Sequence, residues 1–444
     1  MENYNSEEMY LVCIFNISDN TKMFSKKKVL KKLVLLLGKM HNNNYYVLRE
    51  NHKSILQLKQ QGFIQEEENL IFQFVYKKDT IELINLIDFC SFPTNYEKVF
   101  SKVNNLSLKL WKSLPKCTNC EISNLKNSFK NNEDCCICEL KQNDIFRLGD
   151  IKFIIREFHT ITNINNNNNC DDCSKKENEN SRLFSILLKP YFNEYCDICK
   201  KNEQKDTKDD PLLKFCDCNK YRHFKCMKKK FKEILIKDEN NNGCIRYYIK
   251  TNCFYCNKFI PLSFYIKENK DYNLYELVDI PKDNNQEYLI LETVDFLNEQ
   301  EDYIKYIYYI KLREKAKDKN IDTILIGSNR RKDKCEYQYN KLIEIGESSV
   351  SNHHALLDYD IEEKNLTIRN ISNTHNTLVL QNKFVFEKNK NNKLLMELGN
   401  IQIESHLISD KEEFSEIKCK MENNNSGLFY TRNNDTDNDE EIEF

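Results

Sequence analysis

Four closely spaced pairs of cysteine and histidine residues lie between positions 196 and 256 of the chain. In order, they are Cys196 and Cys199, Cys216 and Cys218, His223 and Cys226, and Cys253 and Cys256. Zinc prefers four thiolate or imidazole ligands in a tetrahedron, and two ligands one or two residues apart can bind one ion from a tight turn. Four such pairs provide eight ligands, so this segment predicts two closed, structural zinc sites. Chance clustering in a cysteine-rich chain, the alternative, does not account for four consecutive pairs with a single histidine in fifth place.

The segment that holds these pairs has little apolar material of its own. It is rich in Lys and Asn, and a stretch of this size lacks the core to fold alone. Metal binding is therefore expected to supply part of its folding free energy.

The rest of the composition points to a soluble protein in a reducing compartment. No stretch approaches the roughly 18 apolar residues that a membrane helix needs. Met1–Tyr10 has acidic side chains where a secretory signal has basic ones. We therefore expect a cytoplasmic or nuclear protein without a membrane partner, whose nineteen cysteines stay reduced. With 67 basic and 69 acidic residues, net charge gives no argument for a nucleic-acid partner, and none is expected.

A further cysteine set has the spacing of a zinc ribbon and would suit a third zinc ion. It comprises Cys117, Cys120, Cys135 and Cys138. The alternative is that these are surface thiols in a loop inserted into the N-terminal region. Cys244, within the finger segment, is a spare thiol that would be able to replace one of the eight ligands.

The elements that must position these residues follow from the alternation of apolar and polar stretches. The N-terminal region mixes short apolar runs such as Tyr10–Ile17 with a helix-like stretch, Lys26–Met40. The expected organisation is an irregular β-rich region over 1–160, with the possible cysteine insertion; an Asn-rich linker over 161–184; a zinc finger over 185–265; a β sandwich over 285–410; and an acidic, disordered tail over 420–444.

The prediction of a sandwich rests on apolar runs of strand length separated by polar turns. These runs are Tyr288–Leu291, Thr323–Ile326, Ala355–Leu357, Leu366–Ile368, Leu378–Leu380 and Ile401–Ile403. Asp302–Ala316 reads as either a helix or a long strand within it.

The finger segment resembles the RING-CH, or RING-variant, zinc fingers. The matching stretches are Cys-Asp-Ile-Cys at 196–199, Asp-Pro-Leu-Leu at 210–213, Cys-Asp-Cys at 216–218, His-Phe-Lys-Cys at 223–226 and Cys-Phe-Tyr-Cys at 253–256. The resemblance implies interleaved sites, one on Cys196, Cys199, His223 and Cys226, the other on Cys216, Cys218, Cys253 and Cys256. A PHD finger shares this ligand order and is the alternative, because the four-residue gap from Cys218 to His223 is shorter than is usual for RING-CH.

The resemblance also implies an activity. RING-CH domains are typically ubiquitin ligases that hold a ubiquitin-conjugating enzyme through an apolar residue before the second cysteine and a Trp after the sixth ligand. Ile198 occupies the first position, whereas Lys230 occupies the position of the Trp, with Phe231 beside it.

The C-terminal region resembles a forkhead-associated (FHA) domain. The fragments that carry this resemblance are Ile326-Gly327, Val350 to Ala355, Asn370 to Val379 and Leu398 to Ile401. FHA domains bind phosphothreonine peptides, which implies that Ser351 bonds the phosphate, that Asn352, Thr374 and His375 lie along the peptide, and that His354 braces the loops. Ser328 stands where the family has Arg, and Asn376 where it has Gly. The alternative is a sandwich that has kept its packing while its ligand loops have drifted.

Together, the two resemblances suggest the RING-variant/FHA proteins found in ciliates, and Phe146 to Phe153 resembles a further stretch of that family. The expected fold class is thus multi-domain α+β: a small cross-braced RING-like finger followed by an all-β FHA-like sandwich. The expected function is a ubiquitin ligase that recruits phosphorylated proteins through the FHA domain. The alternative is a non-catalytic adaptor that uses both modules to bind proteins. With only eight Gly residues, no phosphate-binding glycine loop supports a nucleotide enzyme.

Overall fold

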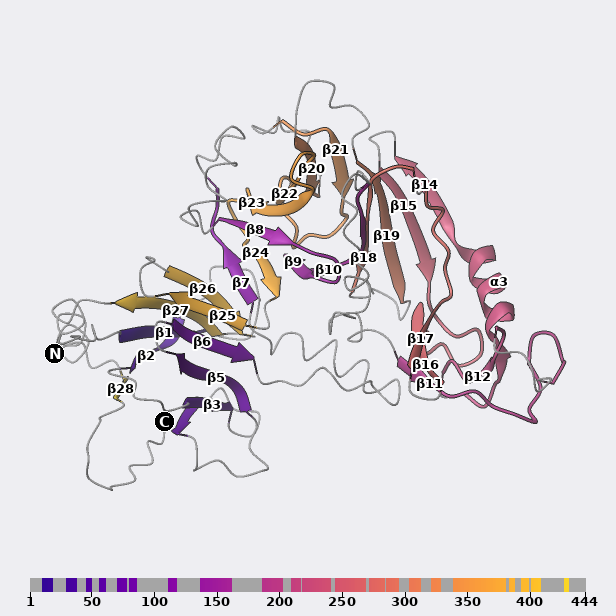
Figure 1. Cartoon of the computed structure of the whole chain (residues 1–444), viewed down its shortest axis with the longest axis horizontal. Helices are drawn as coiled ribbons and strands as arrows, with labels where there is room; N and C mark the ends of the chain where they lie inside the picture. The colour runs from indigo at the N-terminus through magenta and orange to yellow at the C-terminus, as the bar shows by residue number, and fades with distance from the viewer. Residues whose placement is uncertain are drawn as a thin grey trace, which may run out of the picture. The chain divides into compact units, whose positions relative to one another are not determined.

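The computed structural model divides the chain into two compact units (Figure 1). One unit contains 1–87, 107–137 and 376–444, and the other contains 88–106 and 138–375. The residues that the structure describes are 10–18, 29–37, 45–49, 56–60, 70–77, 80–85, 111–117, 136–161, 186–202, 209–216, 218–240, 244–268, 271–283, 285–294, 303–312, 321–328, 338–380, 383–387, 393–398, 401–408 and 427–430.

In its described part, the first unit consists of strands. One sheet has the order β24-β7-β26-β27-β1-β2-β28 and a second has the order β25-β6-β5-β3-β4. The bounds are β1 Tyr10–Ser18, β2 Val29–Leu37, β3 Tyr45–Arg49, β4 Leu56–Gln60, β5 Leu70–Lys77, β6 Thr80–Asn85, β7 Trp111–Leu114, β24 Thr377–Leu380, β25 Lys383–Glu387, β26 Lys393–Leu398, β27 Ile401–Ile408 and β28 Gly427–Tyr430.

Two expectations from the sequence are corrected in this unit. The helix-like stretch Lys26–Met40 contains strand β2, which pairs antiparallel with β1 along almost its whole length. Leu and Lys favour a helix locally, but pairing with a neighbouring strand overrides such weak propensities. Within the tail that we expected to be disordered, β28 pairs in parallel with β2, because Gly427–Tyr430 is an apolar, aromatic run inside an otherwise acidic segment.

The second unit holds the finger segment and most of the region expected to form the sandwich. Its strands are β8 Ile137–Leu140, β9 Ile145–Leu148, β10 Ile151–His159, β11 Ile186–Leu188, β12 Leu212–Leu213, β13 Arg222–His223, β14 Ile236–Asn240, β15 Cys244–Lys250, β16 Ser263–Glu268, β17 Asp271–Glu276, β18 Tyr288–Thr293, β19 Ile304–Lys311, β20 Ile321–Gly327, β21 Lys341–Glu344, β22 Ala355–Asp360 and β23 Asn365–Asn370. The single helix among the described residues, α3, spans Phe224–Ile234.

The largest sheet of this unit has the order β14-β15-β19-β18-β10-β9. Its strands are rich in Ile, Tyr and Phe, which suit a pleated surface. In β18, five of six residues are buried, as expected for a strand covered on both faces. Within Asp302–Ala316, for which helix and strand were both open, Ile304–Lys311 form strand β19, the antiparallel partner of β15 and β18.

A second sheet has the order β21-β20-β22-β23-β8, and an ion pair lies inside it. Arg369 and Asp358 are both almost fully buried, with Nε 2.7 Å from Oδ2, and Thr323 donates to the same carboxylate at 2.8 Å. The ring of Tyr359 on this sheet meets Phe158 of β10 edge to face, at 5.7 Å between centroids. The second unit is therefore a β-rich structure in which two sheets are in contact, compatible with a sandwich.

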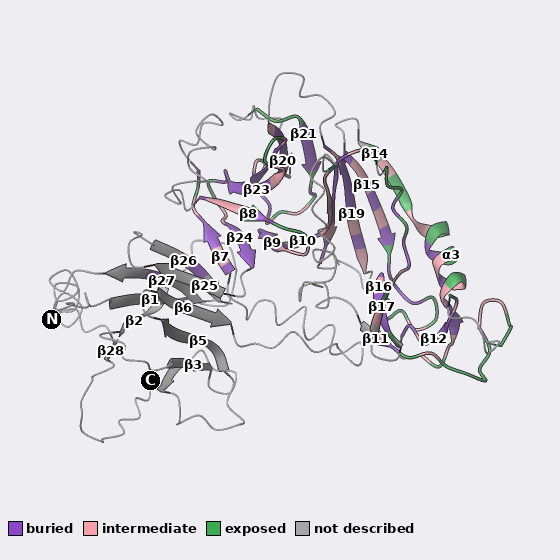
Figure 2. Ribbon diagram, in the orientation of Figure 1, coloured by how far each residue is buried: buried purple, intermediate pink, exposed green. Residues whose placement is uncertain are grey.

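The finger segment packs onto the large sheet through one continuous apolar core. Helix α3 contributes the buried side chains Met227 and Phe231, which join Ile249 of β15 and Ile307 of β19 in the same cluster. Figure 2 shows the exposed outer face of α3 and the buried strands beside it. Below the helix, a small sheet of order β11-β16-β17 adds Phe264 to this core. Finger and sheet are thus packed together rather than joined only by the chain.

Each of the six predicted apolar runs lies in a strand: β18, β20, β22, β23, β24 and β27. The domain boundaries proposed from the sequence stay predictions, and of the 161–184 linker only Ile161 falls within the described residues. In the described part of the chain, no helix is long and apolar enough to cross a membrane.

Candidate metal centre

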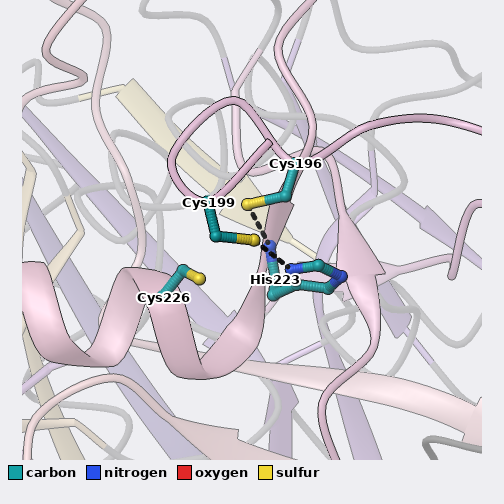
Figure 3. A group of neighbouring side chains, drawn as sticks. All are labelled: Cys196, Cys199, His223 and Cys226. Atoms are coloured by element: carbon teal, nitrogen blue, oxygen red, sulfur yellow. Dashed lines mark hydrogen bonds between the residues drawn. The ribbon is translucent and has the colours of Figure 1, made fainter. Parts of the chain in front are cut away.

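The first group of candidate ligands meets beside the start of α3 (Figure 3). Cys196 and Cys199 lie on one turn, His223 ends β13, and Cys226 lies in the first turn of the helix. Their four ligand atoms all lie within 4.8 Å of one another. Cys199 Sγ is 3.3 Å from His223 Nδ1, and the backbone N–H of His223 donates to Cys196 Sγ at 3.4 Å. This is a set of three thiols and one imidazole around a common centre.

The second group contains only cysteines: Cys216, Cys218, Cys253 and Cys256. The sulfur of Cys216 lies 2.8 Å from that of Cys218 and 3.3 Å from that of Cys253, and Cys218 lies 3.8 Å from Cys253. Two sulfurs that bind one tetrahedral zinc at about 2.3 Å are about 3.8 Å apart. The sulfurs of these three cysteines are therefore as close to one another as in a zinc tetrahedron, or slightly closer.

These are the same two interleaved sets of four that the RING-CH resemblance implies. Both are donor sets of structural zinc, and neither has a position left over for water or substrate.

The two CxxC turns have the same backbone geometry. Lys200 donates its N–H to the carbonyl of Cys196 at 2.8 Å, and Asn257 donates to the carbonyl of Cys253 at 3.0 Å. Lys200 and Asn257 each follow the first cysteine by four residues and have positive φ, +60° and +55°. Isolated antiparallel bridges close the turns, between Tyr195 and Asn202 and between Asn252 and Phe259. The repetition of one turn at both CxxC pairs indicates that the backbone is shaped to present two sulfurs to one ion.

The Asp-Pro-Leu-Leu stretch positions the central pair of ligands. Leu212 of β12 pairs with His223 of β13, which holds the histidine at the edge of the first group. His223 is also the N-cap of α3 but makes no side-chain cap bond. Asp210 takes over that role, since its Oδ1 accepts the N–H of Lys225 at 2.6 Å. The stretch thereby orients both His223 and Cys226.

The thiols of the two groups differ in acidity. The hydrogen bond from Cys216, helped by backbone N–H groups and the positive charge of Arg222, lowers the pKa of Cys253 to about 3. The same bond raises the pKa of Cys216. Burial, together with the neighbouring cysteines, raises the pKa of Cys226 to about 12. The second group thus stabilises negative charge on at least one sulfur, and a divalent cation is the partner that would displace the remaining protons.

The residues expected to contact a conjugating enzyme lie in different environments. Ile198 is half-buried against the finger core. Phe231 is fully buried in that core and so is not on the surface in place of the missing Trp. Lys230 is exposed and pairs with Glu233 at 3.0 Å. Of the three positions, only Ile198 fits a contact with a conjugating enzyme.

Among the described residues, no other cysteine belongs to either group. Cys244 is buried in β15, where burial raises its pKa to about 12, and it belongs to neither group. Cys120 and Cys135 lie outside the described residues, so the third zinc site stays a prediction.

A second polar site, which we term the loop cluster, comprises Ser351, Ser372, Thr374 and His375. Ser351 Oγ lies 2.6 Å from the hydroxyl of Ser372, 2.8 Å from that of Thr374 and 3.3 Å from Nδ1 of His375. Thr374 is also 2.8 Å from the same ring nitrogen. The three residues that the FHA resemblance singled out here are thus in direct contact with one another.

The neighbouring predicted residues hold this cluster in place. His354 is fully buried, and its Nδ1 accepts the N–H of Ser351 at 3.2 Å. Asn352 does not join the cluster, because its Oδ1 accepts the hydroxyl of Ser328 at 3.0 Å. Gly327 sits so close that an added Cβ would lie 1.9 Å from the Asn352 carbonyl oxygen.

Sequence reasoning missed three contributors to these sites. Ser372 is a full member of the loop cluster. The turn between β9 and β10 also reaches this loop: Asp150 donates its N–H to Ser349 Oγ at 3.0 Å, and Gly149, at φ +59°, lies against the Ser349 carbonyl. Arg222 is buried beside the second cysteine group. Only the last carried a local signal, since it directly precedes the histidine ligand on a strand.

Comparison with protein-family models, curated proteins and solved structures finds no match to this chain.

Proposed function

We propose that the chain binds two structural zinc ions in a RING-like finger and that the finger binds a partner protein. The gathering of eight ligand atoms into two groups of tetrahedral size carries this proposal. Each group supplies four protein ligands and so leaves no position on the metal for water or substrate. The metal would therefore stabilise the fold and would not perform chemistry.

Zinc content tests the first half of the proposal. The purified full-length chain should hold two zinc ions in these groups, measured by atomic emission against protein concentration. A zinc content below two per chain would overturn the finger assignment. A third ion would indicate the Cys117 set in addition.

The exposed aromatic surface of the finger supports a protein partner. The rings of Tyr191 and Tyr221 lie 4.8 Å apart, and Lys220 lies over the ring of Tyr255 at 5.2 Å. Four large side chains within or just before the two CxxC turns are more than half exposed: Phe192, Tyr195, Phe254 and Tyr255. Aromatic side chains are enriched at the anchoring positions of protein interfaces.

Ubiquitin ligase activity is the second candidate, and Ile198 is the observation that favours it. The residue lies between the two ligands of the first turn, beside Asp197, which hydrogen-bonds Tyr255 of the second turn. An apolar contact here, flanked by an exposed tyrosine, suits a conjugating enzyme. The buried Phe231 and the exposed Lys230 favour the adaptor instead.

A ubiquitin chain-formation assay with a panel of conjugating enzymes separates these two functions. Activity that is lost in Ile198→Ala, with zinc content unchanged, would establish the ligase. Two zinc ions without activity across the panel would leave the adaptor. Tyr339→Ala, which removes an exposed ring outside the finger, is the matched control.

We also propose that the loop cluster binds a phosphorylated residue of a partner. Two hydroxyls and one imidazole converge on Ser351, and such groups can donate several hydrogen bonds to one phosphate. Asp150 lies near His375 and would repel a phosphate, so the affinity is expected to depend on basic residues nearby in the chain. Direct binding of a phosphothreonine peptide library, compared with its unphosphorylated form, tests the proposal.

A further inference from the structure

Arg222 is buried against the second cysteine group in an unusual environment for a charged side chain. It has no exposed surface, and its Nη2 lies 3.6 Å from Cys253 Sγ and 4.0 Å from Cys218 Sγ. The guanidinium carbon lies 5.1 Å from the centre of the Tyr255 ring. Its Nε and Nη1 are buried without a hydrogen-bond partner, and no carboxylate among the described residues pairs with it.

A buried guanidinium requires a negative partner. Removing an unpaired cation from water costs at least several kcal/mol, and four neutral thiols would not offset that cost. Four thiolates around one divalent zinc carry a net charge of −2, which places an anion beside Arg222. The burial of this arginine therefore indicates that the group carries negative charge on its sulfurs, as a four-thiolate zinc site would.

The two groups differ in charge in a way that Arg222 compensates. Three thiolates and one neutral imidazole around zinc carry a net charge of −1, whereas four thiolates around zinc carry −2. Adding the arginine brings the four-cysteine site to −1 as well. Among the described residues, no Lys or Arg side chain bonds a sulfur of the first group.

The position of Arg222 follows from strand geometry. It precedes His223 directly in β13, and successive residues of a strand point to opposite faces. His223 faces the first group and Arg222 faces the second. One two-residue strand therefore supplies a ligand to one site and a counter-charge to the other.

We propose that Arg222 is a positioning residue that balances the charge of the four-cysteine zinc site and slows the loss of its metal. The inference rests on the proposed function, since it requires both zinc ions. N–H groups that bond metal-bound sulfurs withdraw charge from them and hold them in place, and such outer partners commonly change metal affinity 10- to 100-fold.

Metal release from the full-length protein tests this role. Excess chelator is added, and zinc release is followed with a colorimetric indicator. The wild type should release its zinc in two phases, the slower from the four-cysteine site. Arg222→Met should accelerate that phase about 10-fold or more and leave the other unchanged. Loading with cobalt assigns the phases, because sulfur-to-cobalt absorption differs between four-sulfur and three-sulfur sites.

Two further variants keep the test decisive. Arg222→Lys retains the charge and should fold even if Arg222→Met does not. Its rate of zinc release should lie between those of the wild type and Arg222→Met. Arg246→Met removes another arginine of the same unit, one that pairs with Asp238 and contacts no ligand, and should change neither phase. Equal acceleration of both phases by the Arg222 variants, or none, would overturn the proposal. Absence of bound zinc or cobalt in the wild type would instead overturn the proposed function.

Discussion

The metal groups and the loop cluster are built in opposite ways. In the finger, the candidate ligands come in pairs two or three positions apart, and the same backbone turn presents both CxxC pairs. In the loop cluster, Ser351 meets Ser372 and Thr374 across more than twenty residues of chain. Strands β22 and β23 bring these loops together, with Ala355 opposite Asn370. Local spacing therefore defines the first site, and sheet register defines the second.

The two sites also depend on different sources of stability. The finger shares its apolar core with the large sheet, and metal binding would add to the stability of the finger. The loop cluster rests on a fully buried histidine and on strands whose side chains are almost all buried. Both lie in one compact unit, and β15 links the finger core to the large sheet. Substitutions can therefore show whether the two sites fail together or separately.

Loss of a zinc ligand should have the largest effect. Cys253→Ser should lower the zinc content from two ions to one and strongly lower the thermal unfolding temperature, because binding of a structural zinc is worth about 10–16 kcal/mol. Cys244→Ser makes the same chemical change at a buried thiol outside both groups and should retain both ions. Retention of two ions by Cys253→Ser would exclude this cysteine as a ligand.

A buried ion network in the large sheet should come next. Glu292 lies between Lys305, at 2.6 Å, and Arg156, at 3.4 Å, on the two neighbouring strands. Glu292→Gln should cost about 3–5 kcal/mol in the free energy of unfolding near pH 7, because both cations lose their shared carboxylate. Urea unfolding followed by intrinsic fluorescence measures this cost. Glu239→Gln, in an exposed pair with Lys237, should have no measurable effect.

The pH dependence of the unfolding free energy of Glu292→Gln gives a second test of this ion network. Burial alone would raise the pKa of Glu292, but Lys305 and Arg156 outweigh it and hold the pKa below its ordinary value. A carboxyl whose pKa is lower in the folded than in the unfolded chain stabilises the fold at any pH above its unfolded pKa, which is about 4.3 for Glu. That stabilisation is lost as the pH falls through the folded pKa. The gap between wild type and Glu292→Gln should therefore narrow below about pH 4. A gap that widens at low pH would contradict this assignment.

Close backbone packing behind the loop cluster should have a moderate effect. Gly327→Ala would place Cβ 1.9 Å from the Asn352 carbonyl, and displacing that loop should cost about 2–3 kcal/mol. Gly346→Ala is the control, because nothing lies within 4 Å of the added Cβ. Thermal unfolding of both variants, at unchanged zinc content, shows whether the loops can be disturbed without the finger. Equal unfolding temperatures would mean that the loop moves aside at little cost.

The contrast between the sites also explains what the sequence could predict. The eight candidate ligands were predictable from their close spacing in pairs, and the RING-CH resemblance implied their division into two interleaved groups. Arg222 was not predicted, although it directly precedes a histidine ligand, because a basic, Lys-rich stretch does not show which of its cations is buried. Ser372 and Asp150 were missed because their contacts depend on strand register and on a turn about 200 residues away in the chain. The helix expected within Lys26–Met40 was wrong for the same reason, because the pairing of this stretch with β1 is not encoded locally.

Ser351→Ala should have the smallest effect on stability and the clearest effect on binding. The hydroxyl makes three contacts in a partly exposed cluster, so its loss should cost about 1 kcal/mol. Ser349→Ala removes another hydroxyl of the same loop, one that contacts Asp150 instead of the cluster, and is the matched control. If the cluster binds phosphate, titration calorimetry with a phosphothreonine peptide should show affinity lost in the first variant and kept in the second. If both variants bind the peptide as the wild type does, the hydroxyl of Ser351 serves only to brace the loops, and the peptide binds elsewhere on the chain.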